Sequence, residues 1–262
     1  MSVEKLSRRE ILILGKTLFL TSLVAGVPVA CSSRRSISPH RWDDTSPPID
    51  GKGIATVRFL SGSASANGEP VSAGDRVSSG VVLELATGGQ MVLALPDRSV
   101  LQLKDDTQLT LDLDAEQGGD LTLKHGSLLS VITSRPRSRY YRIRGAAALI
   151  GVKGTVCFLQ VFKPGAPRNP DIPLRATDYF CICNGAIDYL NPASSRTVMS
   201  DSAEHHDPYF LYPDGSEIGF IDTDLLLNHD DREILSLINR MEGQKHETRW
   251  LQKYGSGYHS KS

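Results

Sequence analysis

Two cysteines and two histidines in the C-terminal third of the chain are the residues best suited to chemistry. Cys181 and Cys183 occur in YFCICNGAIDYL, and His205 and His206 follow in EHHDPYF. Residues two apart on a strand point to the same face, with Cα atoms roughly 6.5 to 7 Å apart, so both thiolates can reach one ion. With a histidine nitrogen they would suit one soft or borderline metal ion, namely zinc, copper or iron. The spacing is not that of a standard zinc finger.

Other interpretations of these residues stay open. The chain has four cysteines, and Cys157, Cys181 and Cys183 can simply be small buried hydrophobic residues. In an oxidising compartment they can instead form a disulfide or a redox pair. A bond within the pair would be strained because the side chains are parallel, so a bond from Cys157 to one of them is easier to form. The histidines can equally be surface residues of a loop.

The sequence predicts no catalytic machinery and no nucleic-acid binding. No Ser/His/Asp set can be assembled from it. Gly151, Lys153, Gly154 and Thr155 lie in GVKGT, which superficially looks like a phosphate loop. It lacks the full G-x-x-x-x-G-K-(S/T) pattern and precedes a strand rather than a helix. The net charge of −1 leaves no basic excess for nucleic acid.

The N-terminal segment, residues 1–31, has the layout of an export signal. A short basic region precedes an apolar run over about residues 11–30. Arg8 and Arg9 stand before this run as in a twin-arginine signal. The simpler alternative is ordinary positive charge that keeps the start of the chain in the cytoplasm.

Cys31 ends the apolar run and is a candidate for lipidation. Ala30 fits the small residue that a lipoprotein box needs before its cysteine, whereas Pro28 does not fit the apolar position. An uncleaved membrane anchor is the third possibility, although Lys16 would be costly inside a membrane. A cleaved export signal, a lipidated Cys31 and an uncleaved anchor would each place the later residues in the periplasm. The last two would also tether the protein to a membrane. The Ser- and Pro-rich stretch 32–52 reads as a linker.

Residues 53–163 show the pattern of a mainly β domain. VVLELA (81–86), SVLQLK (99–104) and QLTLDLD (108–114) alternate with period two, which puts one face on a core and the other toward water. Turn residues separate these runs at a spacing near ten residues. We therefore expect an antiparallel β sandwich or a compact β-roll.

Residues 164–254 are expected to form an extension of a small β-hairpin followed by an α-helix. DYFCICNGAIDYL predicts the hairpin, with its turn at Asn184-Gly185. The helix is predicted in TDLLLNHDDREILSLINRMEGQ, where Ile234, Leu237, Ile238 and Met241 form one apolar face. Residues 255–262 read as a disordered tail.

Several of these stretches together resemble the FecR domain, found in regulators of iron uptake. AGDRVSSG (73–80) fits the turn that opens the family pattern, and LPDRS (95–99) fits its L-x-D-G-S hairpin, with Arg98 in place of Gly. GVKGT (151–155) fits the closing (V/I)-R-G-T-x-F motif, with Lys153 for Arg. The resemblance covers about residues 54–162. Some FecR-domain proteins also share a C-x-C-x-G hairpin followed by H-H-D, which Cys181, Cys183 and His205-His206 match here.

The resemblance implies a β domain outside the cytoplasm. Iron-signalling members of the family carry a cytoplasmic segment that controls a sigma factor, and this chain is not expected to have one. We therefore predict a non-catalytic binding or sensing module with an envelope or membrane protein partner, possessing a metal-responsive Cys/His site. The competing hypotheses are a metal- or thiol-dependent redox protein centred on the same residues, and a purely structural envelope component.

Overall fold

The structure is a computed structural model that describes residues 54–114, 118–133, 140–152, 154–167, 172–190, 198–203, 205–214, 217–219 and 226–240. The expected export signal with Arg8, Arg9 and Cys31, the linker and the C-terminal tail lie outside the described residues. So do Lys153 and Met241. No helix within the described ranges is both long and apolar enough to cross a membrane.

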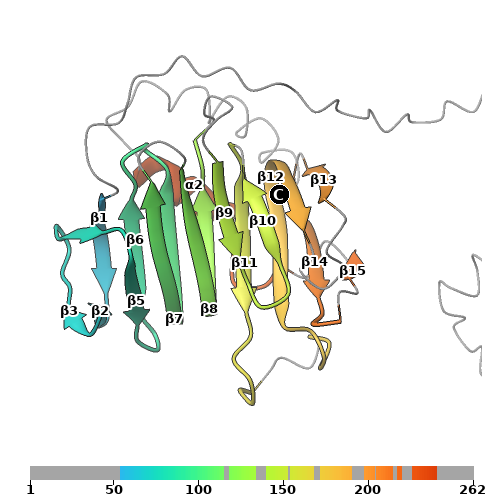
Figure 1. The fold of residues 1–262 in the computed structure, drawn as a ribbon, viewed down its shortest axis with the longest axis horizontal. Helices are drawn as coiled ribbons and strands as arrows, with labels where there is room; N and C mark the ends of the chain where they lie inside the picture. The colour runs from blue at the N-terminus through green and yellow to red at the C-terminus, as the bar shows by residue number, and fades with distance from the viewer. Residues whose placement is uncertain are drawn as a thin grey trace, which may run out of the picture. The chain divides into compact units, whose positions relative to one another are not determined.

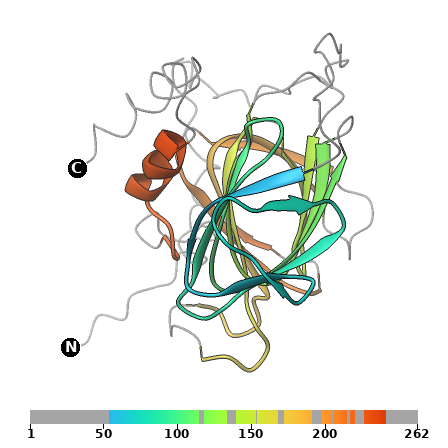
Figure 2. The same ribbon diagram turned by 90° about the vertical axis from the view of Figure 1, so that its left-hand side faces the viewer.

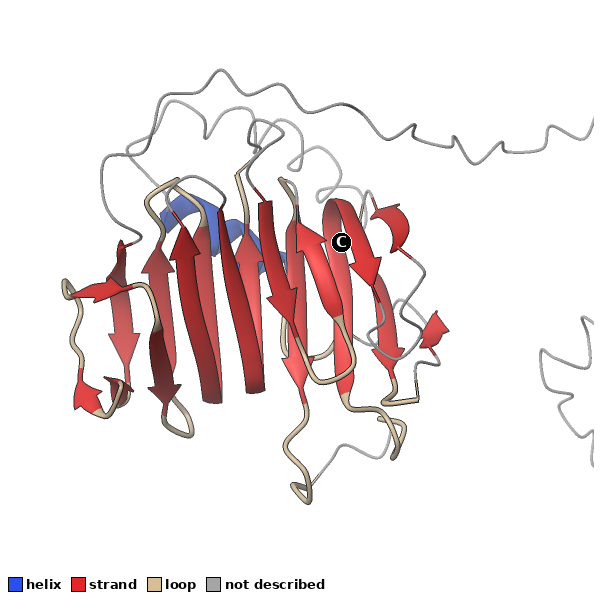
Figure 3. Cartoon of the chain, viewed as in Figure 1, coloured by secondary structure: helices blue, strands red, loops and turns tan. Residues whose placement is uncertain are grey.

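The described part of the chain folds into one continuous sheet of fifteen strands and one helix (Figures 1 and 3). The elements are β1 Ile54–Ser61, β2 Ala64–Ala66, β3 Glu69–Pro70, β4 Arg76–Ser78, β5 Val81–Leu85, β6 Gln90–Ala94, β7 Val100–Asp114, β8 Gly118–Val131, β9 Tyr140–Arg144, β10 Leu149–Val152, β11 Val156–Val161, β12 Asp178–Leu190, β13 Val198–Ala203, β14 Asp207–Leu211, β15 Glu217–Gly219 and α2 Asp231–Arg240. All strand pairs are antiparallel except β8 with β9.

Three long strands fold this sheet over into two facing layers, which Figure 2 shows end-on. The first part of β7 pairs with β6 and its second part with β5. Likewise, β12 pairs first with β11 and β14, and then with β10 and β13. Strand β8 changes layers in the same way, from β9 to β11. The expected antiparallel sandwich or roll is confirmed, and its layers are joined by bent strands.

The bend in β7 and β8 occurs at residues that tolerate positive φ angles. Asp105 and Asp106 have φ values of 37° and 46°, and the register with β8 shifts at this point. Opposite them, Gly126 has φ of 94°, and a Cβ there would lie 2.2 Å from Oγ1 of Thr107. Only glycine fits, so this position fixes where the strands turn from one layer to the other.

Two hydrophobic cores follow from this arrangement. The first lies between the layers and contains the inward side chains, among them Leu83, Leu103 and Leu109. The second lies on the outer face of one layer, where α2 covers it (Figure 2). Its members include Phe158 and Leu237. Burial of apolar area on both faces makes this layer the more completely buried of the two.

The second core corrects the expectation that one face of SVLQLK is in water. Val100 and Gln102 point to the outer face, yet both are buried under α2. The Gln102 side chain donates a hydrogen bond to Glu233 of the helix at 2.5 Å, and Lys104 pairs with the same carboxylate at 2.5 Å. A polar side chain in an alternating pattern can therefore face a covering helix rather than solvent.

The expected turn at Asn184-Gly185 is wrong, because β12 runs through these residues without reversing. Gly185 instead marks the point at which β12 leaves one layer for the other. The predicted helix is present over residues 231–240, and Ile234, Leu237 and Ile238 are buried as expected. Asp230 caps it, since its Oδ1 accepts a hydrogen bond from the backbone N–H of Glu233 at 2.8 Å. A domain boundary at residue 163 stays a prediction.

Candidate metal centre

Strand β12 presents both cysteine thiols to the second core. Cys181 and Cys183 are fully buried, with relative exposures of 0%. Because side chains alternate along a strand, they share the outer face with Tyr179, while Phe180 and Ile182 point between the layers. The spacing therefore does what the sequence predicts, placing two thiols on one face.

The GVKGT segment holds β12 in place beside the thiols. Oγ1 of Thr155 donates a hydrogen bond to the carbonyl of Ala186 at 2.5 Å, just past the bend. Gly185 has φ of 104°, and a Cβ there would lie 3.1 Å from the Gly154 carbonyl oxygen. The close approach and the positive φ both favour glycine, so this contact sets the direction of the strand.

His206 reaches the thiols from the segment before β14. Its Nδ1 lies 3.4 Å from Sγ of Cys181, and its Nε2 donates a hydrogen bond to Oδ1 of Asp231 at 2.7 Å. The backbone N–H of His206 also bonds the carbonyl of Cys183 at 3.2 Å. A carboxylate on the far nitrogen is the usual partner of a metal-binding histidine, because it fixes the ring and its tautomer.

His229, just before α2, is the fourth member of the cluster. Its Nδ1 lies 2.8 Å from the carbonyl oxygen of Leu227 and must donate to it. The ring stacks on Phe158, with centroids 4.3 Å apart and planes at 10°. Its Nε2 is buried and has no hydrogen-bond partner among the described residues. Hydrogen bonding at Nδ1 leaves a lone pair on Nε2, which makes this nitrogen a ready metal ligand.

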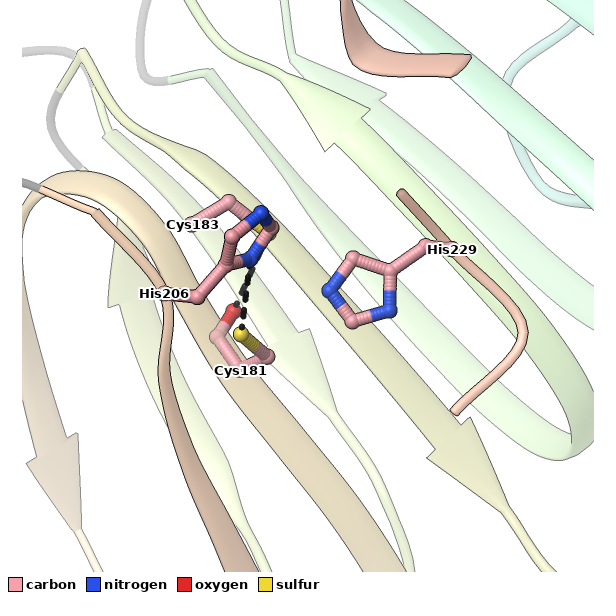
Figure 4. Close-up of side chains that lie close together, drawn as sticks. All are labelled: Cys181, Cys183, His206 and His229. Carbon is pink, nitrogen blue, oxygen red and sulfur yellow. Dashed lines mark hydrogen bonds between the residues drawn. The ribbon is translucent and has the colours of Figure 1, made fainter. Parts of the chain in front are cut away.

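The ligand atoms of Cys181, Cys183, His206 and His229 all lie within 4.8 Å of one another. Both rings lie on the same side of β12 as the thiols (Figure 4). A tetrahedral zinc ion with its usual bond lengths requires ligand separations of about 3.3 to 3.8 Å. A contraction of about 1.5 Å at most would therefore close the four atoms around one ion, and the S₂N₂ donor set suits zinc.

The electrostatics of the cluster favour a thiolate at Cys181. Burial alone would raise its pKa, but hydrogen bonds from Cys183 and His206 hold the pKa well below its usual range. Burial and the neighbouring Cys181 sulfur raise the pKa of Cys183 well above the usual value. Although burial opposes the change, Cys181 and Asp231 raise the pKa of His206. Both directions favour a charged Cys181–His206 pair in the metal-free cluster.

The structure separates His205 from the ligand set that the sequence suggested. Its side chain is 38% exposed and bonds Oδ2 of Asp231 through Nε2 at 3.2 Å. His205, His206 and Asp231 form a second group of close ligand atoms, nearer the surface. The predicted residues that come together in the buried cluster are therefore Cys181, Cys183 and His206.

Cys157 lies on the opposite face of the sheet from the other two thiols. It pairs with Ile182 in the ladder and points between the layers, where Oγ of Ser130 lies 3.0 Å from its sulfur. Burial raises its pKa to about 12. Cys157, Cys181 and Cys183, the cysteines among the described residues, are free thiols. The suggested disulfide from Cys157 to Cys181 or Cys183 would require one strand to turn its side chains over.

Sequence reasoning missed His229 because no spacing connects it to the cysteines. It stands in LLLNHDDRE, directly before the helix. The available signal was its place at the start of an amphipathic helix, since such a helix must lay its apolar face on the sheet. Which part of the sheet it covers depends on the whole topology.

Comparison with known proteins agrees with the motifs. Residues 81–167 match the family model described as FecR protein. Residues 81–167 form a FecR domain. This domain runs from β5 to the segment after β11 and includes GVKGT. All four clustered ligands come after it in the sequence.

Solved structures give weaker likenesses to this FecR-domain chain. Two crystal structures of a proposed anti-sigma factor from Parabacteroides distasonis ATCC 8503, at 1.65 and 2.50 Å resolution, each match at 13% identity and a TM-score of 0.44. Each match covers 62% of this chain and 75% of the other. None of the curated proteins matches the chain.

Proposed function

We propose that this protein is an extracytoplasmic sensing module in which a FecR domain is followed by a site for one zinc-like ion. The observation that carries the proposal is the buried cluster of Cys181, Cys183, His206 and His229, whose four ligand atoms lie within 4.8 Å. Its FecR domain supports a signalling role. An envelope or membrane protein is the expected partner.

The chemistry of the cluster favours a closed site over a catalytic one. Four protein ligands fill a tetrahedral ion, whereas catalytic zinc keeps a position open for water or substrate. All four side chains are buried, with His229 the most exposed at 5%. An ion held in this way would respond to metal supply and would tie together three segments of the chain.

Metal analysis of the purified protein tests the proposal. About one equivalent of zinc, copper or iron is expected in the wild type, since the donor set is built for one ion. Cys181→Ser and His229→Ala should each lose it. His205→Ala is the matched control, because it removes a histidine outside the buried cluster. Metal-free wild-type protein that also fails to take up added zinc would refute the site.

The export half of the proposal depends on Arg8 and Arg9. Replacing both with lysine keeps the charge but removes the paired arginines that twin-arginine export reads. We expect the variant to stay in the cytoplasm while the wild type reaches the periplasm, as fractionation would measure. Equal export of both would favour the simpler charge explanation. Radiolabelled lipid incorporated into the wild type and absent from Cys31→Ala would establish the lipid tether.

A second candidate function is thiol chemistry at Cys181. The favouring observation is that His206 lies 3.4 Å from its sulfur and is itself held by Asp231 at 2.7 Å. A nucleophile, a base and an orienting carboxylate share this order in thiol enzymes. The full burial of Cys181 speaks against it, because a nucleophile must meet its substrate. Rapid alkylation of Cys181 by iodoacetamide in zinc-loaded protein would favour the thiol function over the metal site.

A further inference from the structure

We propose that His205 and Asp231, which lie beside the outer nitrogen of His206, form a surface loading site through which the ion reaches the buried cluster. This inference rests on the proposed metal-binding function and adds a second, transient site to it. The ligand class is a borderline divalent ion such as zinc or cobalt, because imidazole and carboxylate are its ordinary donors.

The side chains of His205, Asp231 and His206 lie in a row that leads from the surface to the buried thiols. The side chains of His205 and Asp231 are 38% and 34% exposed, whereas that of His206 is 2% exposed. Asp231 bonds both histidines through different oxygens, at 3.2 and 2.7 Å. The two histidine rings are 4.5 Å apart edge to face. Their ligand atoms meet the same 4.8 Å separation as the buried four.

His206 belongs to both groups because its two nitrogens point in opposite directions. Nε2 faces Asp231 and the surface group, while Nδ1 faces Cys181. Beyond it, the His229 ring lies 5.2 Å from the His206 ring, centroid to centroid. An ion held by His205 and Asp231 is therefore separated from the buried donors by a single imidazole ring.

Such a site solves the problem of loading a buried centre. A hydrated divalent ion cannot enter an apolar core without losing its water, and each lost water must be replaced by a ligand. Exposed His205 and Asp231 replace the first waters where solvent is still available. The buried thiolates then hold the ion more tightly than two exposed groups can. The outer site consequently binds the ion weakly and exchanges it readily. It affects the rate of loading more than the final affinity of the buried cluster.

Cobalt(II) reports the passage of the ion directly, because its thiolate charge-transfer absorption develops only when the ion reaches the cysteines. Full-length metal-free protein is mixed with cobalt chloride in a stopped-flow instrument and the absorption is followed. The variants are His205→Ala, which removes an exposed side chain outside the buried cluster, and Ser236→Ala, a matched exposed control on α2.

We expect His205→Ala to slow the appearance of the absorption by roughly tenfold or more, the scale on which groups just outside a metal's ligands act. The final absorption should equal that of the wild type, and Ser236→Ala should load at the wild-type rate. Equal rates for His205→Ala and wild type would overturn the loading site while leaving the buried centre intact. Absence of the absorption in wild type would overturn the buried centre, and the loading site with it.

Discussion

Asp231 is not one of the four candidate ligands, but the geometry of the centre depends on it. It fixes the His206 ring by accepting the Nε2 hydrogen bond at 2.7 Å, which leaves Nδ1 to face the Cys181 sulfur. At the start of α2 its charge is also favourable to the helix dipole. One side chain thus connects helix, imidazole and thiolate.

Replacing Asp231 with alanine should weaken zinc binding by about 10- to 100-fold, because His206 loses the partner that orients it. Asp231→Asn keeps an oxygen that can accept the same hydrogen bond, so it should retain more of the affinity. Competition against a chromogenic zinc chelator measures both. Equal affinities for Asp231→Ala and wild type would show that the carboxylate does not position the ring.

Asp178, at the start of β12, gives the protein a predictable response to pH. Burial raises its pKa to about 6 from the usual 3.8, although hydrogen bonds from the Ala147 and Ala146 backbone oppose the rise. The folded state therefore holds this proton at pH values where the unfolded state has released it. Stability from this residue is present at low pH and is lost as the pH rises through about 6.

The size of the loss is roughly 3 kcal/mol, from a shift of about two pKa units. Urea unfolding from pH 4 to pH 7 should show this fall in the free energy of unfolding for the wild type. Asp178→Asn cannot titrate, so its profile should be flatter by that amount. Parallel profiles for the two proteins would mean that the carboxyl is not perturbed by burial.

At the residue scale, the sequence predicted the thiol pair but not all of the ligands that accompany it. A period of two is enough to place Cys181 and Cys183 on one face of a strand. The two adjacent histidines differ in role because the backbone at His206, with φ of 21°, turns that ring inward and leaves His205 outside. No pattern in the sequence records that turn, and His229 arrives from a helix whose docking is a tertiary event.

At the scale of elements, strand β12 and helix α2 are the parts that the candidate centre would join. β12 supplies both thiols, while the segment that leads into α2 supplies His229 and Asp231. The helix is held on the outer face of the sheet by Ile234, Leu237 and Ile238, and by the contacts of Glu233 with Gln102 and Lys104. A bound ion would add a direct link between helix and sheet.

Removal of the metal should therefore loosen residues 226–240. Zinc at roughly 100 times its dissociation constant contributes about 2.7 kcal/mol to the states that bind it, which corresponds to exchange up to about 100-fold slower. Hydrogen exchange with and without zinc would measure this in α2. Amides of β5, in the opposite layer, serve as the internal control. Identical hydrogen exchange of α2 with and without zinc would show that the ion does not stabilise the helix.

The sequence also identified most elements correctly while missing how they connect. Alternation located the strands, and the apolar spacing located α2. The Asn184-Gly185 dipeptide favours a hairpin turn locally, but here the glycine serves a bend between layers. Val100 and Gln102 were expected to be solvent-facing because their period is that of a one-sided strand. The first error arises from the bend of β12 between layers and the second from the second core, and only the folded chain creates these features.

At the scale of the whole molecule, the FecR domain and the ligand-bearing strands share one two-layered sheet. β12 pairs with β11 and β10 on its two halves, so the thiols are built directly onto the edge of the stretch that matches the family. A structural change at the ligands would therefore act directly on the sheet that includes the FecR domain. This continuity is the structural reason for proposing a sensing role for the Cys/His cluster.

X-ray absorption at the zinc edge tests the four-ligand centre most directly. Zinc-loaded full-length protein should show about two sulfur neighbours near 2.3 Å and about two nitrogen neighbours near 2.0 to 2.1 Å, as a closed S₂N₂ site requires. His205→Ala should give the same spectrum, and His229→Ala should lose one nitrogen neighbour. A shell of oxygen and nitrogen with no sulfur would contradict the assignment of Cys181 and Cys183 as ligands.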